Sequence, residues 1–306
     1  MTLPHHEPRP LPGRQPLQIS DEVIERYHQD GIVRIQQAFD ADWVEFMRDG
    51  FQQCMDRPGK YAEFICDNVD WKNLYDEDAK QRDADMFQDQ LFFEEALERL
   101  PCWSSFVLHS QVGELIGTLM RSKTAQFFYM HPIMKRGGGT EKEIPWHQDL
   151  PYWKIDGSQI GSVWVALDDM PLESGVRYLK GSHRWGEFRP QHFVDGSPYE
   201  GRDELPAMPD VEAMLREGRT EMLAWELKAG DALCFDARIV HGSRGNFSGQ
   251  GHDHRRVAFR FGGDDAVYRN KCGEVAIPIP EVDARHGLSD GDHLACKSFP
   301  TVWPPT

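Results

Sequence analysis

The sequence predicts a mainly β protein, a double-sheet jelly roll with flanking α-helices. Two observations lead to this fold class. From Thr124 onward, short runs of strand-forming residues are broken by Gly, Pro and Asp, the pattern of an antiparallel jelly roll. Before that point, apolar residues recur at helical spacing. The 306 residues would permit two domains. Because all-β barrels often reach about 200–250 residues as one domain, we expect a single domain over residues 18–306.

The amino-terminal elements follow from local signals. Residues 1–17 contain several prolines and few large apolar residues, which favours an irregular arm. Ser20 can cap a helix over residues 21–29, and Gly31 can end it. The same reasoning predicts a strand at Ile32–Ile35 and helices near residues 41–56 and 107–121.

Two stretches depart from the rhythm of short strands. Residues 136–144 contain three consecutive glycines, which favours a flexible approach to the strand that follows. Residues 187–222 form a long insertion, with a helix expected near 209–217. Long loops at the mouth of a barrel commonly select ligands or close over them. We therefore expect this insertion to resemble a lid.

The strongest chemical signal is the H-x-D pattern in Trp146–Asp149. Residues i and i+2 of an extended strand lie on the same face. His147 and Asp149 can therefore both point into a barrel while Gln148 points away. His241 lies much later in the chain, after a separate apolar run, and can come from a strand that is adjacent in space.

Two imidazoles and one carboxylate in this order form the ligand set of a facial triad, which leaves three positions on a ferrous ion open. Each part of the pattern is weak alone, and the combination favours an iron-dependent oxygenase. The chain contains 13 histidines, so several must be bystanders. We expect those in polar segments to be exposed to solvent: His5, His6, His252 and His254.

Several stretches accompany these three residues in a characteristic order: Trp146–Asp149, Ser162–Asp169, Glu173–Gly175, Gly181–Gly186, Ala229–Asp231, His241–Ser243 and Arg256. With them the chain resembles the phytanoyl-CoA dioxygenase family of iron(II)- and 2-oxoglutarate-dependent oxygenases, roughly over residues 20–265. The resemblance implies a double-stranded β-helix, the cupin-like form of the jelly roll. It also implies Fe(II) as cofactor, with 2-oxoglutarate and O2 as cosubstrates.

By this resemblance the three triad residues bind iron, and Arg256 pairs with the distal carboxylate of 2-oxoglutarate. A physical reason supports an arginine there. A planar guanidinium presents two parallel donors to a carboxylate, and charge-assisted bonds of this kind contribute about 1.5–3 kcal/mol. Arg255 should face the opposite side of the strand, whereas Arg260 shares the face of Arg256. Both remain alternatives as the anchor.

Three more positions match the cosubstrate pocket by resemblance: Trp164, Ser243 and His131. Trp164 and His131 also have a second interpretation as core residues, because Trp buries well where its N–H finds a partner. Arg177 stands where the family generally has an apolar residue. If Arg177 faces the pocket, it favours an anionic substrate. Otherwise its stem packs on the sheet.

The composition is that of a soluble enzyme without a polyanionic partner. Lys and Arg number 34 against 50 Asp and Glu, for a net charge of −16, which disfavours nucleic acid and anionic membranes as partners. The amino terminus lacks the apolar stretch of a signal peptide, and no segment approaches a membrane span. The six cysteines are scattered, without a Cys-x-x-Cys pair, as expected of reduced thiols. We therefore expect a cytoplasmic protein.

These observations predict a 2-oxoglutarate-dependent dioxygenase that hydroxylates a small organic substrate and releases succinate and CO2. Hydroxylation is favoured over halogenation because related halogenases lack the carboxylate that Asp149 supplies here. Desaturation and ring chemistry stay open. Two other classes remain as alternatives: a cupin-like metalloenzyme that does not use 2-oxoglutarate, and a noncatalytic binding protein on the same scaffold.

Overall fold

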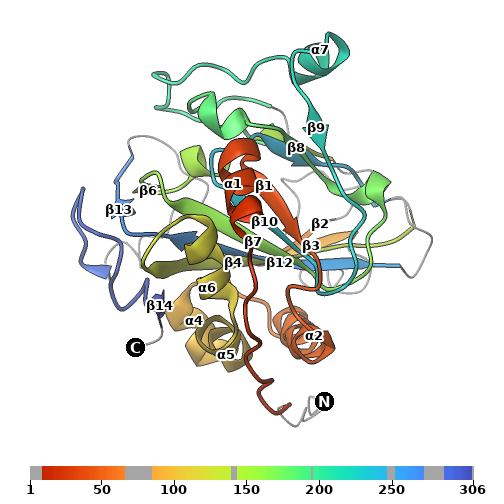
Figure 1. Cartoon of the computed structure of the whole chain (residues 1–306), viewed down its shortest axis with the longest axis vertical. Helices are drawn as coiled ribbons and strands as arrows, with labels where there is room; N and C mark the ends of the chain where they lie inside the picture. Colours follow the sequence, from red (N-terminus) through yellow and green to blue (C-terminus); the bar gives the residue numbers. More distant parts are fainter. Residues whose placement is uncertain are drawn as a thin grey trace.

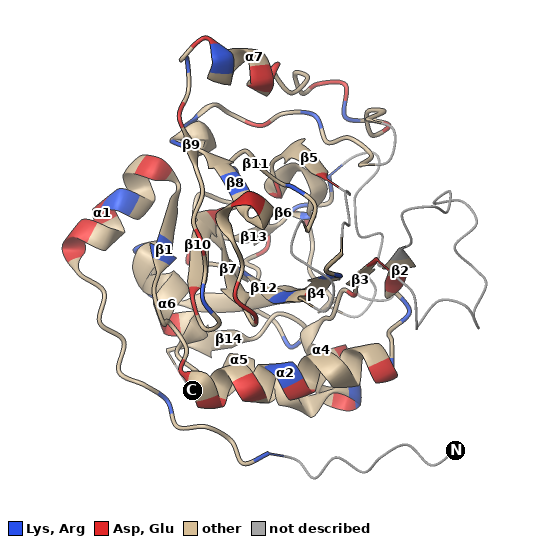
Figure 2. Cartoon of the chain, turned by 90° about the vertical axis from the view of Figure 1, so that its right-hand side faces the viewer, with Lys and Arg blue, Asp and Glu red and all other residues tan. Residues whose placement is uncertain are grey.

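The structure, a computed structural model, describes residues 9–65, 85–138, 143–193, 196–246, 252–271 and 286–304. Two antiparallel β-sheets lie face to face, and helices cover the outer face of the larger sheet (Figure 1 and Figure 2). The predicted jelly roll with flanking helices is confirmed. Of the glycine-rich stretch expected over 136–144, residues 139–142 lie outside the described residues.

The larger sheet has eight strands in the order β1-β10-β7-β12-β4-β3-β2, with β14 paired to β4. In chain order the strands are β1 (Ile32–Ile35), β2 (Glu63–Ile65), β3 (Met86–Gln88), β4 (Ala125–Lys135), β7 (Ile160–Ala166), β10 (Ala232–Asp236), β12 (His254–Gly262) and β14 (Thr301–Trp303). The central strands β7, β10 and β12 are buried along almost their whole length. They are correspondingly rich in apolar and aromatic residues.

The smaller sheet has four strands in the order β5-β11-β8-β9. These are β5 (Ile144–His147), β8 (Val176–Leu179), β9 (Met222–Leu223) and β11 (His241–Ser243), and a separate pair joins β6 (Ile155–Asp156) to β13 (Val267–Tyr268). A core cluster contains Trp164 and Phe235 from the larger sheet and Tyr178 from the smaller one. The space between the sheets is therefore packed.

The helices are α1 (Asp21–Asp30), α2 (Ala41–Asp56), α4 (Phe93–Arg99), α5 (Pro101–His109), α6 (Val112–Leu119) and α7 (Val211–Arg216). Short 3-10 turns are η2 (Leu150–Tyr152), η3 (Leu172–Ser174) and η4 (Ser182–Arg184). Helices α2, α4 and α5 lie below the larger sheet in Figure 2, and α7 lies at the far end of the molecule, beyond the smaller sheet. The helices predicted over 21–29 and 41–56 are confirmed, and α7 falls within the helix expected near 209–217.

The helix expected over 107–121 is wrong in its bounds. Helix α5 ends at His109, Ser110 is extended, and α6 begins at Val112. The Ser110 hydroxyl accepts a hydrogen bond from the Val112 N–H at 3.2 Å. Such a local bond competes with a continuous helix, so the segment divides into two helices. Pro101 begins α5, where its missing N–H has no helical partner to lose.

Two smaller expectations also fail. Ser20 occupies the N-cap of α1, but its side chain makes no capping hydrogen bond. His254, expected to be exposed, is only 2 % exposed because it begins β12. Gly31 does end α1, with a φ of 82° that favours glycine and an N–H that donates to the Tyr27 carbonyl.

Two predictions from composition are consistent with the part of the chain that the structure describes. The cysteines in it are free thiols: Cys54, Cys102, Cys234 and Cys296. Cys234 is fully buried in β10, as expected of a cysteine that packs as a small apolar residue. No helix among these residues has the length and apolar character needed to cross a membrane.

Side chains of β12 alternate between the helices and the space between the sheets. The ring of Phe259 stacks on that of Phe106 in α5, with centroids 4.8 Å apart. Its neighbours Ala258 and Arg260 therefore face the interior, and so does Arg256. Strand alternation thus brings two arginines to the inner face of the larger sheet.

Candidate metal centre

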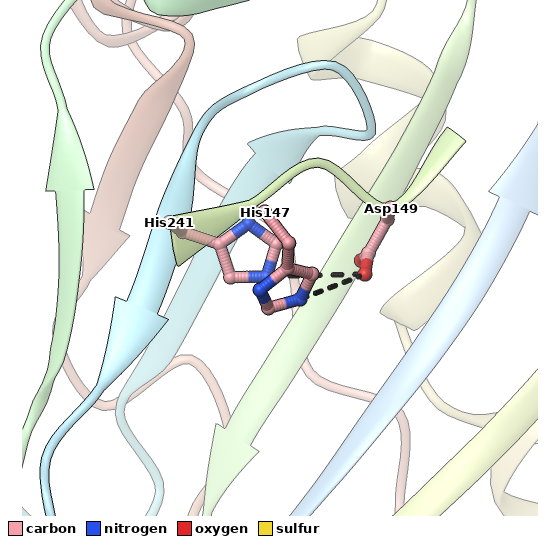
Figure 3. Close-up of side chains that lie close together, drawn as sticks. All are labelled: His147, Asp149 and His241. Atoms are coloured by element: carbon pink, nitrogen blue, oxygen red, sulfur yellow. Dashed lines mark ion pairs between the residues drawn. The ribbon is translucent and has the colours of Figure 1, made fainter. Parts of the chain in front are cut away.

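His147, Asp149 and His241 come together on the inner side of the smaller sheet (Figure 3). His147 ends β5 and His241 begins β11, and the two residues lie opposite each other in this antiparallel pair. The Nε2 atoms of His147 and His241 lie 3.7 and 3.8 Å from Oδ1 of Asp149. Three potential ligand atoms, two nitrogens and one carboxylate oxygen, therefore converge.

Asp149 reaches this centre by a route that differs from the prediction. Strand β5 ends two residues earlier, and Asp149 has helical backbone angles (φ −77°, ψ −44°) at the N-cap of η2. Its backbone N–H donates to the Ala237 carbonyl at 3.0 Å. Gln148 points away from the site, as predicted, and its amide donates to the carbonyls of Gly186 and Arg238. A turn held by tertiary hydrogen bonds, and not strand alternation, brings Asp149 to the site.

Both imidazoles are oriented through the nitrogen that faces away from the centre. Nδ1 of His147 lies 2.8 Å from the Pro145 carbonyl oxygen, and Nδ1 of His241 lies 3.0 Å from that of Ile239. Because a carbonyl oxygen only accepts, each Nδ1 carries the proton and donates. In the neutral tautomer that this bond selects, each Nε2 carries the lone pair and is directed at the centre. Histidine ligands of metal ions are typically held in this way, so the three residues fit a divalent ion.

The protonation states also suit metal binding. Burial, and then the neighbouring His147, lower the pKa of His241 to about 3, so its imidazole is neutral at neutral pH. Burial raises the pKa of Asp149, but Arg260 and the two histidines outweigh it and hold this pKa well below its ordinary value. His241 therefore offers a neutral nitrogen and Asp149 an ionised carboxylate oxygen.

The three residues line a cavity of about 370 Å³, at the lower end of the range for small-molecule sites. The insertion over 187–222 contributes Phe193 and Tyr199 to the wall, whereas α7 in the same insertion contributes none of its residues. The four residues predicted to contact a cosubstrate all line this cavity: His131, Trp164, Ser243 and Arg256.

Arg256 is a buried cation without a carboxylate partner. It is 5 % exposed, forms no ion pair within the described residues, and its Nε makes no hydrogen bond. The guanidinium carbon lies 5.9 Å from the ring centroid of Trp164. Burial lowers the pKa of Arg256 to about 10, so the side chain is still charged at neutral pH. Because an unpaired buried charge is unfavourable, this position is suited to receive an anion.

The two neighbouring arginines have carboxylate partners. Arg255 faces the other side of β12, as predicted, and its Nη2 lies 2.8 Å from Oδ1 of Asp168. Arg260 faces the cavity, and its Nη2 lies 3.3 Å from Oδ2 of Asp149. Sequence reasoning considered Arg260 only as an anchor and missed this ion pair, because the pair joins a strand of the larger sheet to a turn remote in sequence.

A buried lysine accompanies the cosubstrate candidates. Nζ of Lys135 donates to Oγ of Ser243 at 3.1 Å and to the Arg244 carbonyl at 2.7 Å, although Lys135 is only 1 % exposed. His131 lies 3.3 Å from the Gln88 side-chain oxygen through its Nε2, and burial lowers the pKa of His131 to about 3. Sequence reasoning missed Lys135, whose only signal is its place at the end of a long apolar strand.

Arg177 does not line the cavity. Its neighbours on β8, Val176 and Tyr178, do so, and alternation turns Arg177 to the opposite face. There its guanidinium carbon lies 4.9 Å from the ring centroid of Trp146. This position matches the packing interpretation of Arg177, so Arg177 gives no support for an anionic substrate.

Fold and centre together define a jelly-roll protein with a candidate facial-triad metal site, and the sequence identifies its family. The model of the phytanoyl-CoA dioxygenase (PhyH) family matches residues 27–257, and the chain belongs to this family. The phytanoyl-CoA dioxygenase domain-containing protein 1 homolog of Dictyostelium discoideum is 25% identical over 173 residues, which are 56% of this chain and 58% of that protein. The chain thus matches less than two thirds of that relative's length.

Solved structures share the fold. The non-heme alpha ketoglutarate dependent carbocyclase SnoK from nogalamycin biosynthesis has a TM-score of 0.67 at 19% identity, covering 92% of this chain and 96% of SnoK. The epimerase SnoN, in complex with Fe3+, alpha ketoglutarate and nogalamycin RO, has a TM-score of 0.65 at 18% identity, covering 92% and 98%. EctD from S. alaskensis, with 2-oxoglutarate and 5-hydroxyectoine, has a TM-score of 0.60 at 18% identity, covering 92% and 90%. At these identities the likeness establishes the fold alone.

Proposed function

We propose that the protein is an Fe(II)- and 2-oxoglutarate-dependent dioxygenase that hydroxylates a small organic substrate and releases succinate and CO2. One observation carries the proposal: Arg256, a buried cation without a carboxylate partner among the described residues, lines the same cavity as the triad. A metal site alone would not require it. Membership of the phytanoyl-CoA dioxygenase family supports the same function.

The triad would hold the ferrous ion through Nε2 of His147, Nε2 of His241 and one oxygen of Asp149. A ferrous ion held by two imidazoles and one carboxylate would leave room for the keto acid and O2 and would support their oxidising chemistry. Asp149 would fill the ligand place that a halide needs, so we propose hydroxylation and not halogenation.

Arg256 would bind the distal carboxylate of 2-oxoglutarate. Its planar guanidinium can donate two parallel hydrogen bonds, and it lies beside the Trp164 ring. The Ser243 hydroxyl, held by Lys135, provides a second polar contact on this wall. His131 remains neutral because its pKa lies at about 3, and therefore adds no charge to the pocket.

The remaining wall favours a neutral or cationic substrate. Apart from the two arginines and Asp149, the charged side chains that the described residues contribute to the cavity are the carboxylates of Glu63 and Glu143. Near the solvent, where Phe193 is 40 % exposed, the wall is aromatic and includes Tyr152, Phe193 and Tyr199. Since Arg177 lies outside the cavity, the described residues offer an anionic substrate no cation that is not already engaged by Asp149 or 2-oxoglutarate.

The two competing functions have less support. A cupin-like metalloenzyme that does not use 2-oxoglutarate would need no buried arginine in the metal cavity, yet Arg256 is there. A noncatalytic binding protein would not need both histidines held with Nε2 directed at one carboxylate oxygen. These two observations favour the dioxygenase.

Anaerobic titration with Fe(II) and then with 2-oxoglutarate tests the proposal. We expect the weak visible charge-transfer band of the chelated complex only when both are present, and no band in His147→Ala. Folded protein that binds one equivalent of Fe(II) but shows no band at saturating 2-oxoglutarate would overturn it. Oxygen uptake that does not depend on the keto acid would support the cupin-like alternative instead.

A further inference from the structure

We propose that Arg260 is a positioning residue for the metal-binding carboxylate. Its ion pair with one oxygen of Asp149 turns the other oxygen toward the two histidines. The inference rests on the proposed metal site and gives the two buried arginines of β12 different tasks. Arg256 receives the cosubstrate, and Arg260 orients a metal ligand.

The two carboxylate oxygens of Asp149 face different partners. Oδ1 lies 3.7 and 3.8 Å from the Nε2 atoms of His147 and His241. Oδ2 lies 3.3 Å from Nη2 of Arg260 and makes no hydrogen bond within the described residues. The ion pair is therefore the polar contact that restrains Oδ2. A half-turn of the carboxylate exchanges two equivalent oxygens and restores the same pair, but any smaller rotation would lengthen or break it.

Arg260 is itself held in place. Its side chain is 7% exposed, and its strand, β12, is paired on both sides, with β4 and with β7. The guanidinium carbon lies 5.4 Å from the ring centroid of Trp153 and 5.7 Å from that of Phe235. Guanidinium groups interact favourably with aromatic rings. Burial and the two aromatic rings thus keep the Arg260 charge beside Asp149.

The partners of the two arginines separate their roles. Arg256 and Arg260 lie on one face of β12, and both line the cavity. Arg256 has no carboxylate partner among the described residues, whereas Arg260 has Asp149. A charge that is already compensated attracts a second carboxylate less strongly than an uncompensated one. Arg256 is consequently the better anchor for 2-oxoglutarate.

The ion pair has a consequence for the metal site. A carboxylate restrained at Oδ2 offers an incoming metal ion a single oxygen, Oδ1, and leaves neighbouring positions free. Without Arg260, Asp149 could rotate or bind through both oxygens. Removal of a group that orients a metal ligand typically lowers the affinity for the metal by about 10–100-fold.

Titration of metal-free Arg260→Met with Co(II), in the absence of 2-oxoglutarate, tests this role. Removing a positive charge beside the site would by itself tighten the binding of a cation, whereas protonation of Asp149 would weaken it only at low pH. Weaker binding that persists as the pH of the titration is raised therefore reports lost orientation. We expect Co(II) affinity about 10–100-fold below wild type and an altered visible spectrum of the bound ion. Arg260→Lys, which keeps the charge, should recover part of both.

Arg256→Met is the matched control. This variant removes a buried arginine from the same face of the same strand. Unlike Arg260, the arginine that it removes forms no ion pair or hydrogen bond with Asp149. Its Co(II) affinity should equal or exceed that of wild type. Thermal unfolding of the metal-free proteins shows whether each variant is folded, and Arg260→Gln replaces Arg260→Met if the latter is not.

Two results would overturn the proposal. The first is Co(II) affinity in folded Arg260→Met that equals or exceeds wild type. The second is normal Co(II) affinity with lost binding of 2-oxoglutarate, which would make Arg260 the anchor. Because the probe is Co(II) alone, a wild-type protein that binds Co(II) but not 2-oxoglutarate would contradict the proposed function and not the role of Arg260.

Discussion

His147 and His241 lie directly opposite each other in the antiparallel pair of β5 and β11, with ring centroids 4.2 Å apart. The backbone carbonyls of Pro145 and Ile239 orient the two rings, and Asp149 joins them from the following turn. Backbone pairing and local hydrogen bonds thus build the centre from segments remote in sequence. We therefore expect the site to be formed before metal binds, and metal to stabilise the folded state.

Substitution of a triad histidine should abolish stabilisation by metal. A ligand that binds only the folded state at a concentration of 100 times its Kd adds about 2.7 kcal/mol to the free energy of unfolding. We expect Co(II) to raise the Tm of wild type and not that of His147→Ala or His241→Ala, as measured by calorimetry. His109→Ala, at an exposed position of α5, is the control and should keep the full shift. A full shift in His147→Ala would place the metal elsewhere.

Arg256→Met should weaken the binding of 2-oxoglutarate without weakening the fold. Loss of a charge-assisted pair of about 1.5–3 kcal/mol corresponds to an affinity reduced by about 10–100-fold. The metal-free variant should be at least as stable as wild type, since a buried charge without a carboxylate partner is removed. Calorimetric titration of the Co(II)-loaded protein measures the affinity for 2-oxoglutarate.

Arg255→Met is the control, because Arg255 pairs with Asp168 on the other face of the strand. This variant should bind 2-oxoglutarate normally. Equal losses of affinity in both variants would argue against a specific anchor.

Phe193→Ala should change substrate selection and leave the metal centre intact. The Phe193 ring lies 4.7 Å from that of His147 and 5.7 Å from that of Tyr152, at the solvent side of the cavity. Its removal widens the entrance without removing a metal ligand. We expect the order of preferred substrates in a succinate-release screen to change, with Co(II) affinity within about twofold of wild type. Met222→Ala, a substitution of a similarly exposed residue of β9 outside the cavity, should preserve the order.

His254 should make the stability of the protein depend on pH. Burial lowers the pKa of His254 to about 4 from its ordinary value of 6.5. Between these values the unfolded chain binds a proton that the folded chain excludes, so this contribution to stability is complete above pH 6.5 and falls as the pH decreases toward 4. We expect the advantage of wild type over His254→Gln in free energy of unfolding to decrease by about 1–3 kcal/mol over this range. Denaturant titrations at several pH values measure it. Parallel pH profiles of the two proteins would contradict this role.

Structural features that depend only on residues close together in the chain could be predicted from the sequence. Apolar spacing located α2 correctly, and the glycine at position 31 marked the end of α1. Alternation along β12 correctly separated Arg255 from Arg256 and Arg260. In each case the periodicity of a regular backbone determines which side chains share a face. The same reasoning was wrong at Ser110, where a side-chain hydroxyl bonds to the backbone and divides a helix.

The sequence by itself determined the fold class, the family and the residues whose side chains could bind a metal, because these depend on periodicity and on motifs. Only the tertiary structure decided how those residues meet. Asp149 is brought to the site by a turn held by Ala237, Arg260 of β12 pairs with Asp149 in that turn, and Arg177 lies outside the cavity. The physical reason is common to all three. A local pattern specifies the face on which a side chain lies, whereas its partner comes from a distant segment whose position depends on how the sheets pack.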